Sequence, residues 1–147
     1  MCTYIDKKAT EKMKNGLKDK KVAYAWKVVQ IDDGYWFAPF WGNFYAQENS
    51  THGQHISIST EHGREAIHGG VFYLSLTRKL ANFLLKNRKI EFNNYDKKFK
   101  VVKVSFKPED IVYVGDCGAF DKRTYEMPAG PDTVCVKAFS FIDKIGE

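Results

Sequence analysis

A predicted β-hairpin near the start of the chain restricts the possible folds more than any other feature of the sequence. Residues 22–31 read VAYAWKVVQI, a run rich in the β-branched and aromatic side chains that favour a strand. Asp32, Asp33 and Gly34 follow as a turn signal, and residues 35–40 then predict a return strand. Two runs joined by a tight turn pair as antiparallel neighbours, so we expect an antiparallel sheet.

Helical periodicity occurs in two places. The stronger pattern covers residues 76–87, where Ser75 or Thr77 can cap the first turn, and the weaker covers residues 7–20. Further strands are predicted at residues 56–59, 71–74, 100–106, 111–114 and 134–142. Strands and helices do not alternate regularly, which argues against a doubly wound parallel sheet. We therefore predict an α+β fold: a largely antiparallel, curved sheet with the main helix packed on it and a short N-terminal helix.

Charge separates the first residues from the rest of the chain. The formal charge is +5, and residues 1–30 hold eight lysines against three carboxylates, which leaves 15 basic and 15 acidic residues elsewhere. We divide the chain into a lysine-rich helical segment, residues 1–21, and a single α+β domain, residues 22–147, which we expect to fold alone. A solvated helix face explains the lysines more simply than a nucleic-acid surface, which stays open as an alternative.

Composition indicates a folded protein of the cytoplasm. Aromatic residues make up 15% of the 147 residues, more than a disordered chain carries. No run approaches the ~20 apolar residues that cross a bilayer, and residues 1–21 lack the apolar core of a signal peptide. The cysteines, Cys2, Cys117 and Cys135, are odd in number and irregularly spaced, which favours a reducing compartment.

An aromatic run over residues 35–45 is the most unusual local feature, because seven of its eleven residues carry aromatic rings. In a half-buried strand alternate rings would face water and could contact a partner or stack on a nucleotide base. The alternative is a strand buried on both faces in a small core. On the contact interpretation the candidate residues are Tyr35, Trp36, Phe40, Trp41 and Tyr45. A second contact surface is predicted in the glycine- and proline-rich loop 115–132, with candidates Asp116, Phe120, Arg123 and Tyr125.

Four histidines lie close together in the sequence: His52, His55, His62 and His68. The H-x-x-H spacing of the first two could serve a metal, but zinc needs further ligands, and the motifs that usually supply them are absent. We expect no metal site. His68 is the better candidate for ligand contact, because Gly69 and Gly70 follow it at the start of a strand.

Residues 68–75, HGGVFYLS, precede a helix and locally resemble the histidine-and-glycine strand elements of mono-ADP-ribosyltransferases. The resemblance implies that His68 and Tyr73 hold a nicotinamide nucleotide. The glutamate such an enzyme needs could be Glu91 or Glu126. Phosphate-binding loops of the P-loop or dinucleotide type are absent.

Over most of its length the order of elements resembles a group of small uncharacterised proteins of tailed phages and gut-bacterial prophages. The matching pieces are residues 1–2 (MC), 25–29 (AWKVV), 38–41 (APFW), 44–45 (FY), 70–76 (GVFYLSL) and 101–115 (VVKVSFKPEDIVYVG). The lysine helix and the histidine-bearing stretch are departures from that pattern. The resemblance implies a phage accessory protein that acts by binding in a host cytoplasm.

Three functions follow from these observations. The first is non-enzymatic binding of a host protein or a nucleotide-like ligand, with inhibition of a host defence system as its setting. The alternatives are a small ADP-ribosyltransferase-like enzyme and a nucleic-acid-binding protein that uses the lysine helix. We expect no cofactor and no membrane association.

Overall fold

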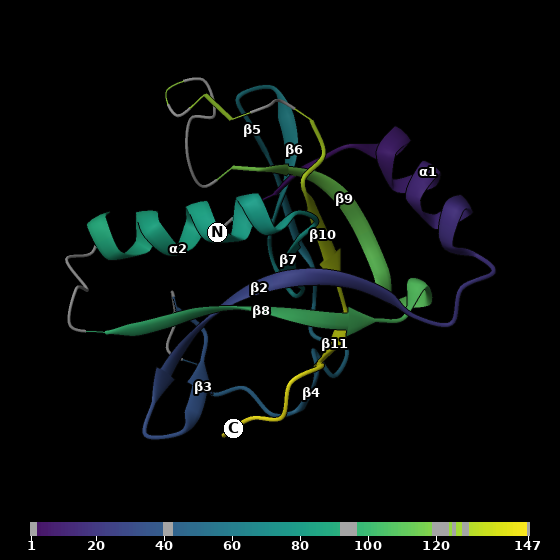
Figure 1. Cartoon of the computed structure of the whole chain (residues 1–147). Helices are drawn as coiled ribbons and strands as arrows, with labels where there is room; N and C mark the ends of the chain where they lie inside the picture. Colours follow the sequence, from purple (N-terminus) through teal and green to yellow (C-terminus); the bar gives the residue numbers. More distant parts are fainter. Residues whose placement is uncertain are drawn as a thin grey trace.

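A computed structural model describes residues 3–39, 43–91, 97–118, 124, 126–127 and 130–146, with side chains left out for 88–91. Two α-helices, one short 3-10 helix and eleven strands lie in these residues, and the strands form one antiparallel sheet (Figure 1). The predicted α+β class is confirmed. The strands are β1 (Thr3–Ile5), β2 (Ala23–Asp32), β3 (Tyr35–Phe37), β4 (Glu48–Ser50), β5 (Ser57–Glu61), β6 (Arg64–Gly69), β7 (Phe72–Ser75), β8 (Lys98–Phe106), β9 (Ile111–Cys117), β10 (Thr133–Val136) and β11 (Ala138–Phe141).

The sheet consists of two halves that are joined at one point. The strand order is β4-β11-β8-β2-β7-β10-β9-β1-β6-β5, with β3 paired to β2. The first four strands and β3 form what we call the β8 half-sheet, and the other six form the β9 half-sheet. Trp26 of β2 and Ser75 of β7 are the one residue pair that joins the halves across this boundary. Beyond this pair β2 and β7 are not paired with each other.

Two tight turns fix the hairpins on which the register depends. Asp33 and Gly34 have φ of 52° and 80°, and His62 and Gly63 have φ of 52° and 75°. Positive φ at both central residues is the geometry of the type I′ turn, which matches the twist of paired strands. The predicted hairpin is therefore confirmed, although its return strand ends at Phe37.

Strand β1 was not anticipated from the sequence. It lies between β9 and β6, inside the sheet rather than at an edge. Ile5 pairs with Gly115, where a Cβ atom would overlap the backbone carbonyl of Tyr4. A glycine at position 115 is therefore what lets β1 approach β9.

Helix α1 (Lys7–Leu17) is fastened to β9 by a buried hydroxyl. Asp6 caps the helix by accepting a hydrogen bond of 2.9 Å from Ala9 N. Thr10, which is 5% exposed, accepts a bond of 2.8 Å from Val114 N and donates one of 2.7 Å to Asp6 O. The lysine-rich segment is thus attached to the sheet through its buried side.

The predicted C-terminal strand is divided in two. β10 lies between β7 and β9, whereas β11 lies between β8 and β4. At the break, Lys137 N donates to Asp110 O, in the 3-10 helix Pro108–Asp110, at 3.0 Å. One continuous segment therefore contributes a strand to each half-sheet.

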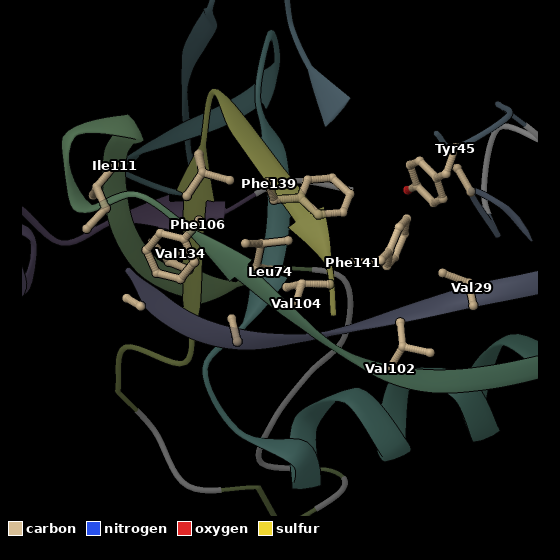
Figure 2. Packing of buried hydrophobic residues seen from close by; sticks show 14 of the residues in the cluster. Val29, Tyr45, Leu74, Val102, Val104, Phe106, Ile111, Val134, Phe139 and Phe141 are labelled. Carbon is tan, nitrogen blue, oxygen red and sulfur yellow. The ribbon is translucent and has the colours of Figure 1, made fainter. Parts of the chain in front are cut away.

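Apolar residues fill both faces of the sheet. Helix α2 (Arg78–Glu91) runs beside β2 and β8 over a small cluster that includes Val28, Leu80 and Leu84 (Figure 1). Thr77 caps it by accepting from Leu80 N at 3.2 Å. The larger cluster fills the inside of the curved sheet, as Figure 2 shows for Val29, Tyr45, Leu74, Val102, Val104, Phe106, Ile111, Val134, Phe139 and Phe141. In the described part of the chain, no helix is both long and apolar enough to cross a membrane.

Candidate functional site

A cavity of about 750 Å³ lies where β2 and β7 separate. Its walls come from β2, residues 38–39 and 43–46, β4 and the turn after it, the end of β6, and β7, with contributions from α2 and β10. The lining residues used below are Lys27, Phe44, Tyr45, Glu48, His52, His68, Gly69, Gly70, Phe72 and Tyr73. This volume is typical of sites for small molecules.

Lys27 brings a single amine into apolar surroundings in this cavity. Side chains alternate along β2, so Lys27 shares its face with Ala25 and Val29, which are 1% and 0% exposed. Its Nζ donates a hydrogen bond of 3.0 Å to the backbone carbonyl of Tyr73. The same nitrogen lies 5.6 Å and 5.5 Å from the ring centroids of Tyr45 and Phe139. One carbonyl and two ring faces therefore lie around the amine of a side chain that is only partly exposed.

Among the residues that the structure describes, no carboxylate forms an ion pair with Lys27. The ion pairs among the described residues join Lys7 to Glu65, Arg64 to Asp116 and His68 to Glu61. Burial lowers the pKa of Lys27 from 10.5 to about 8, and the nearby Cys135 opposes this only in part. Burial also raises the pKa of Cys135 to about 12, so its thiol is neutral at physiological pH. An anion that entered the cavity would meet an ammonium that forms no ion pair with the described carboxylates.

Aromatic rings form the apolar wall beside this amine. Tyr45 is 6% exposed, and burial raises the pKa of its phenol far above the ordinary value. Its ring centroid lies 5.8 Å from that of Phe139, which in turn lies 4.9 Å from Phe72. Phe44 is 58% exposed and also lines the cavity. Phe44 therefore adds an exposed ring to the same cavity lining that contains Lys27.

Polar groups and a glycine complete the lining. Glu48, His52 and His68 all line the cavity, so it does contain a carboxylate. Gly70 has φ of 81°, and a Cβ there would overlap the backbone carbonyl of His55. Any side chain at position 70 would therefore be strained by the positive φ and would also clash with the His55 carbonyl.

His68 contacts the side chains of Ser59 and Glu61 through the same ring nitrogen. Nε2 lies 2.6 Å from Ser59 Oγ and 3.4 Å from Glu61 Oε1. A hydrolytic triad needs the carboxylate on one ring nitrogen and the nucleophile on the other. The Ser59–His68–Glu61 group does not have that geometry. His68 is held at the cavity as a polar contact.

The structure separates the members of the aromatic run. Trp36 is 2% exposed, and its ring packs edge-on against Phe141 at 4.9 Å, so it belongs to the core rather than to a contact surface. Tyr35 is 53% exposed but does not line the cavity. Tyr45 lies in the core and in the cavity wall, while Phe40 and Trp41 lie outside the described residues.

Asp116 forms hydrogen bonds that connect two segments of the fold. One carboxylate oxygen accepts from Arg64 Nη2 at 2.9 Å and the other from Gly130 N at 3.1 Å, so Asp116 ties the end of the 115–132 loop to β6. It does not line the cavity. The other predicted contact residues of this loop, Phe120, Arg123 and Tyr125, fall outside the described residues.

The histidine and glutamate predictions have mixed outcomes. In the part of the chain that the structure describes, no group of three or more His, Cys, Asp or Glu side chains could hold a metal. His68 and Tyr73 both line the cavity, and that they hold a nicotinamide nucleotide stays a prediction. Glu126 does not line it, and the side chain of Glu91 is outside the described residues. The carboxylate in the cavity is that of Glu48, which the sequence did not single out.

Replacing Lys27 by methionine is expected to stabilise the fold. The pKa shift from 10.5 to about 8 corresponds to roughly 3 kcal/mol of penalty for burying the charge, and loss of the bond to Tyr73 offsets about 1 kcal/mol of it. Lys27→Met should therefore raise the free energy of unfolding by about 2 kcal/mol at pH 7. Above pH 8 the folded wild-type chain loses this proton before the unfolded chain does, so the advantage should shrink as pH rises toward 10.5. Urea unfolding of Lys27→Met and of the exposed control Lys98→Met measures this, and equal effects of the two substitutions would contradict it.

Comparison of the chain with protein-family models, curated proteins and solved structures found no match.

Proposed function

We propose that the chain is a binding protein that takes a small, anionic, ring-bearing ligand of nucleotide type into the cavity. The observation that carries this proposal is the Lys27 amine, which is half-buried against two aromatic rings and has no ion-pair partner among the described residues. Burying a charge is unfavourable unless it is paired, so natural proteins keep such groups mainly at functional sites. A bound phosphate or carboxylate supplies the missing partner.

The rest of the cavity supports a nucleotide-like ligand over a simple anion. The Tyr45 ring lies beside Lys27, Phe44 adds an exposed ring to the same lining, and stacking on aromatic rings is how proteins commonly hold bases. Glu48 and His52 supply acceptors and donors for ribose hydroxyls or base edges. In the phage setting that the sequence resemblance implies, such a protein would sequester a host nucleotide and so block a defence that depends on it.

Calorimetric titration with NAD, ADP-ribose and AMP tests the proposal. Lys27→Met should abolish binding of whichever probe binds the wild-type chain, while Lys98→Met, an exposed lysine of β8, should leave the affinity unchanged. The ligand should be recovered intact by chromatography. Binding that survives Lys27→Met would overturn the assignment of the anion site.

The affinity should also depend on pH. Anion binding favours the ammonium form of Lys27, whose pKa in the free protein is about 8. Below that pH the amine already carries its proton, so the affinity for NAD should be constant. Above it a proton must be taken up on binding, and the affinity should fall by up to tenfold per pH unit. The same titration with Lys27→Arg, which stays charged, should show no such fall.

A second candidate is an ADP-ribosyltransferase-like enzyme, favoured by the presence of Glu48 beside His68 and Tyr73 in one cavity lining. Transferases of this type need a carboxylate near the nicotinamide ribose, and Glu48 is the group that could serve. Labelled NAD and host lysate separate the two functions. Transfer of label that Glu48→Gln removes would replace the binding function by the enzymatic one.

A further inference from the structure

A row of alternating rings and cations crosses the outer face of β2 and β8, away from the cavity. Lys103 Nζ lies 4.8 Å from the ring centroid of Tyr24 and 5.9 Å from that of Trp26. On the far side of Trp26 from Tyr24 in this series, the guanidinium of Arg78 lies 5.4 Å from the Trp26 ring centroid. We call these four residues the ring–cation row. Tyr24 and Trp26 alternate with Lys27 along β2, so they point away from its face.

The row is accessible. Tyr24 is 52% exposed, Arg78 and Lys103 are exposed, and Trp26 is partly buried where it packs beside α2. Helix α2 begins at Arg78 and continues over Val28 and Val101, so it covers the neighbouring part of this face. The chain thus leaves two large rings at the edge of the area that the helix protects.

Charge identifies the kind of partner. None of the ion pairs among the described residues includes Lys103 or Arg78. Exposed Lys79 follows Arg78 in the first turn of α2, and this turn carries no acidic residue. The row therefore offers positive charge and ring faces together, although residues 31–147 as a whole are electrically balanced.

We propose that the ring–cation row binds single-stranded nucleic acid. Proteins that hold single strands combine basic side chains along the backbone with rings on which the bases stack, and a strand face is a common platform for this. Lys103 and Arg78 contact phosphates, and Tyr24 stacks on a base. This site is separate from the lysine helix that the sequence suggested as a nucleic-acid surface.

Fluorescence anisotropy with a labelled oligo-dT of about 12 nucleotides tests the proposal, since sites on comparable platforms cover about 4–16 nucleotides. Tyr24→Thr and Lys103→Gln should each weaken binding by about tenfold. Lys103→Gln should also reduce the slope of log K against log salt by about 0.7, the value for one phosphate contact on a single strand. Matched controls are Tyr35→Thr, which removes an equally exposed strand tyrosine, and Lys12→Gln, which removes a charge from α1. Neither control should change the affinity, and all four variants should melt within a few degrees of the wild type.

Three outcomes would overturn the proposal. The first is no binding of oligo-dT at about 100 µM protein, the weak limit of non-specific binding. The second is an equal loss with Lys12→Gln, which would move the site to α1. The third is stronger binding of a duplex of equal length, or of poly-glutamate, through the same residues.

Discussion

Deletion of residues 1–20 should abolish the cooperative thermal unfolding of the chain. The deletion removes β1, which pairs on both sides inside the sheet, and leaves unpaired the backbone edges of β6 and β9. It also removes Thr10, whose hydroxyl satisfies the buried Val114 N. Unpaired buried backbone groups cost about 1–3 kcal/mol each, so losing several exceeds the stability of an ordinary domain.

Two glycine variants distinguish the loss of β1 pairing from the shortening of the chain itself. In Gly115→Ala the new Cβ would overlap the Tyr4 carbonyl and force β1 away from β9, so a loss of about 3 kcal/mol or more is expected. Gly69→Ala is the matched control, because nothing lies within 4 Å of a Cβ at that position. Calorimetry of the truncated chain, Gly115→Ala and Gly69→Ala measures the loss of stability in each. A truncated chain with a cooperative melt near that of the wild type would show that β1 is dispensable.

Trp36→Ala should lower the free energy of unfolding by about 3–5 kcal/mol, the range for deleting a buried ring. The Trp36 side chain is 2% exposed and lies against Phe141, so its removal leaves a cavity in the main core. Tyr35→Ala, one residue earlier and 53% exposed, should change stability by about 0.5 kcal/mol or less. Urea unfolding of both variants gives the comparison. A loss below about 1 kcal/mol for Trp36→Ala would contradict its place in the core.

Local signals in the sequence were sufficient for the hairpin and the main helix. The turn at Asp33 and Gly34 depends on residues that tolerate positive φ, and α2 depends on apolar spacing, so both can be read from short windows. β1 has only three residues, and what makes it a strand is its pairing with β9 and β6. Pairing between strands that are far apart in the sequence cannot be recognised from a short stretch of residues.

The N-terminal segment shows the same limit. Its lysines made residues 1–21 look separable from the rest of the chain. Its attachment to β9 depends on Gly115 and on the hydroxyl of Thr10, two residues that carry no sequence signal of their own. The structure therefore leads to the opposite expectation for the deletion.

The site was only partly predictable for a related reason. Both faces of β2 carry apolar or aromatic residues, so alternation could not show whether Lys27 points into the core or toward water. The answer depends on where β7 leaves β2, which is a property of the whole sheet. His68, Tyr73 and Tyr45 were found because glycines and aromatic residues mark them. Lys27 had no such mark, since a lysine in a strand is ordinarily exposed.

The division of the last strand between the two half-sheets has a consequence for synthesis of the chain. β10 and β11 occupy interior positions in the sheet but come last among the described strands, so neither half-sheet can close until residues 133–141 have been made. Until residues 133–141 emerge from the ribosome, β7, β9 and β8 present open edges, which are prone to pair with other strands. Closure of both half-sheets depends on contacts between segments that are far apart in the sequence, which makes folding slow.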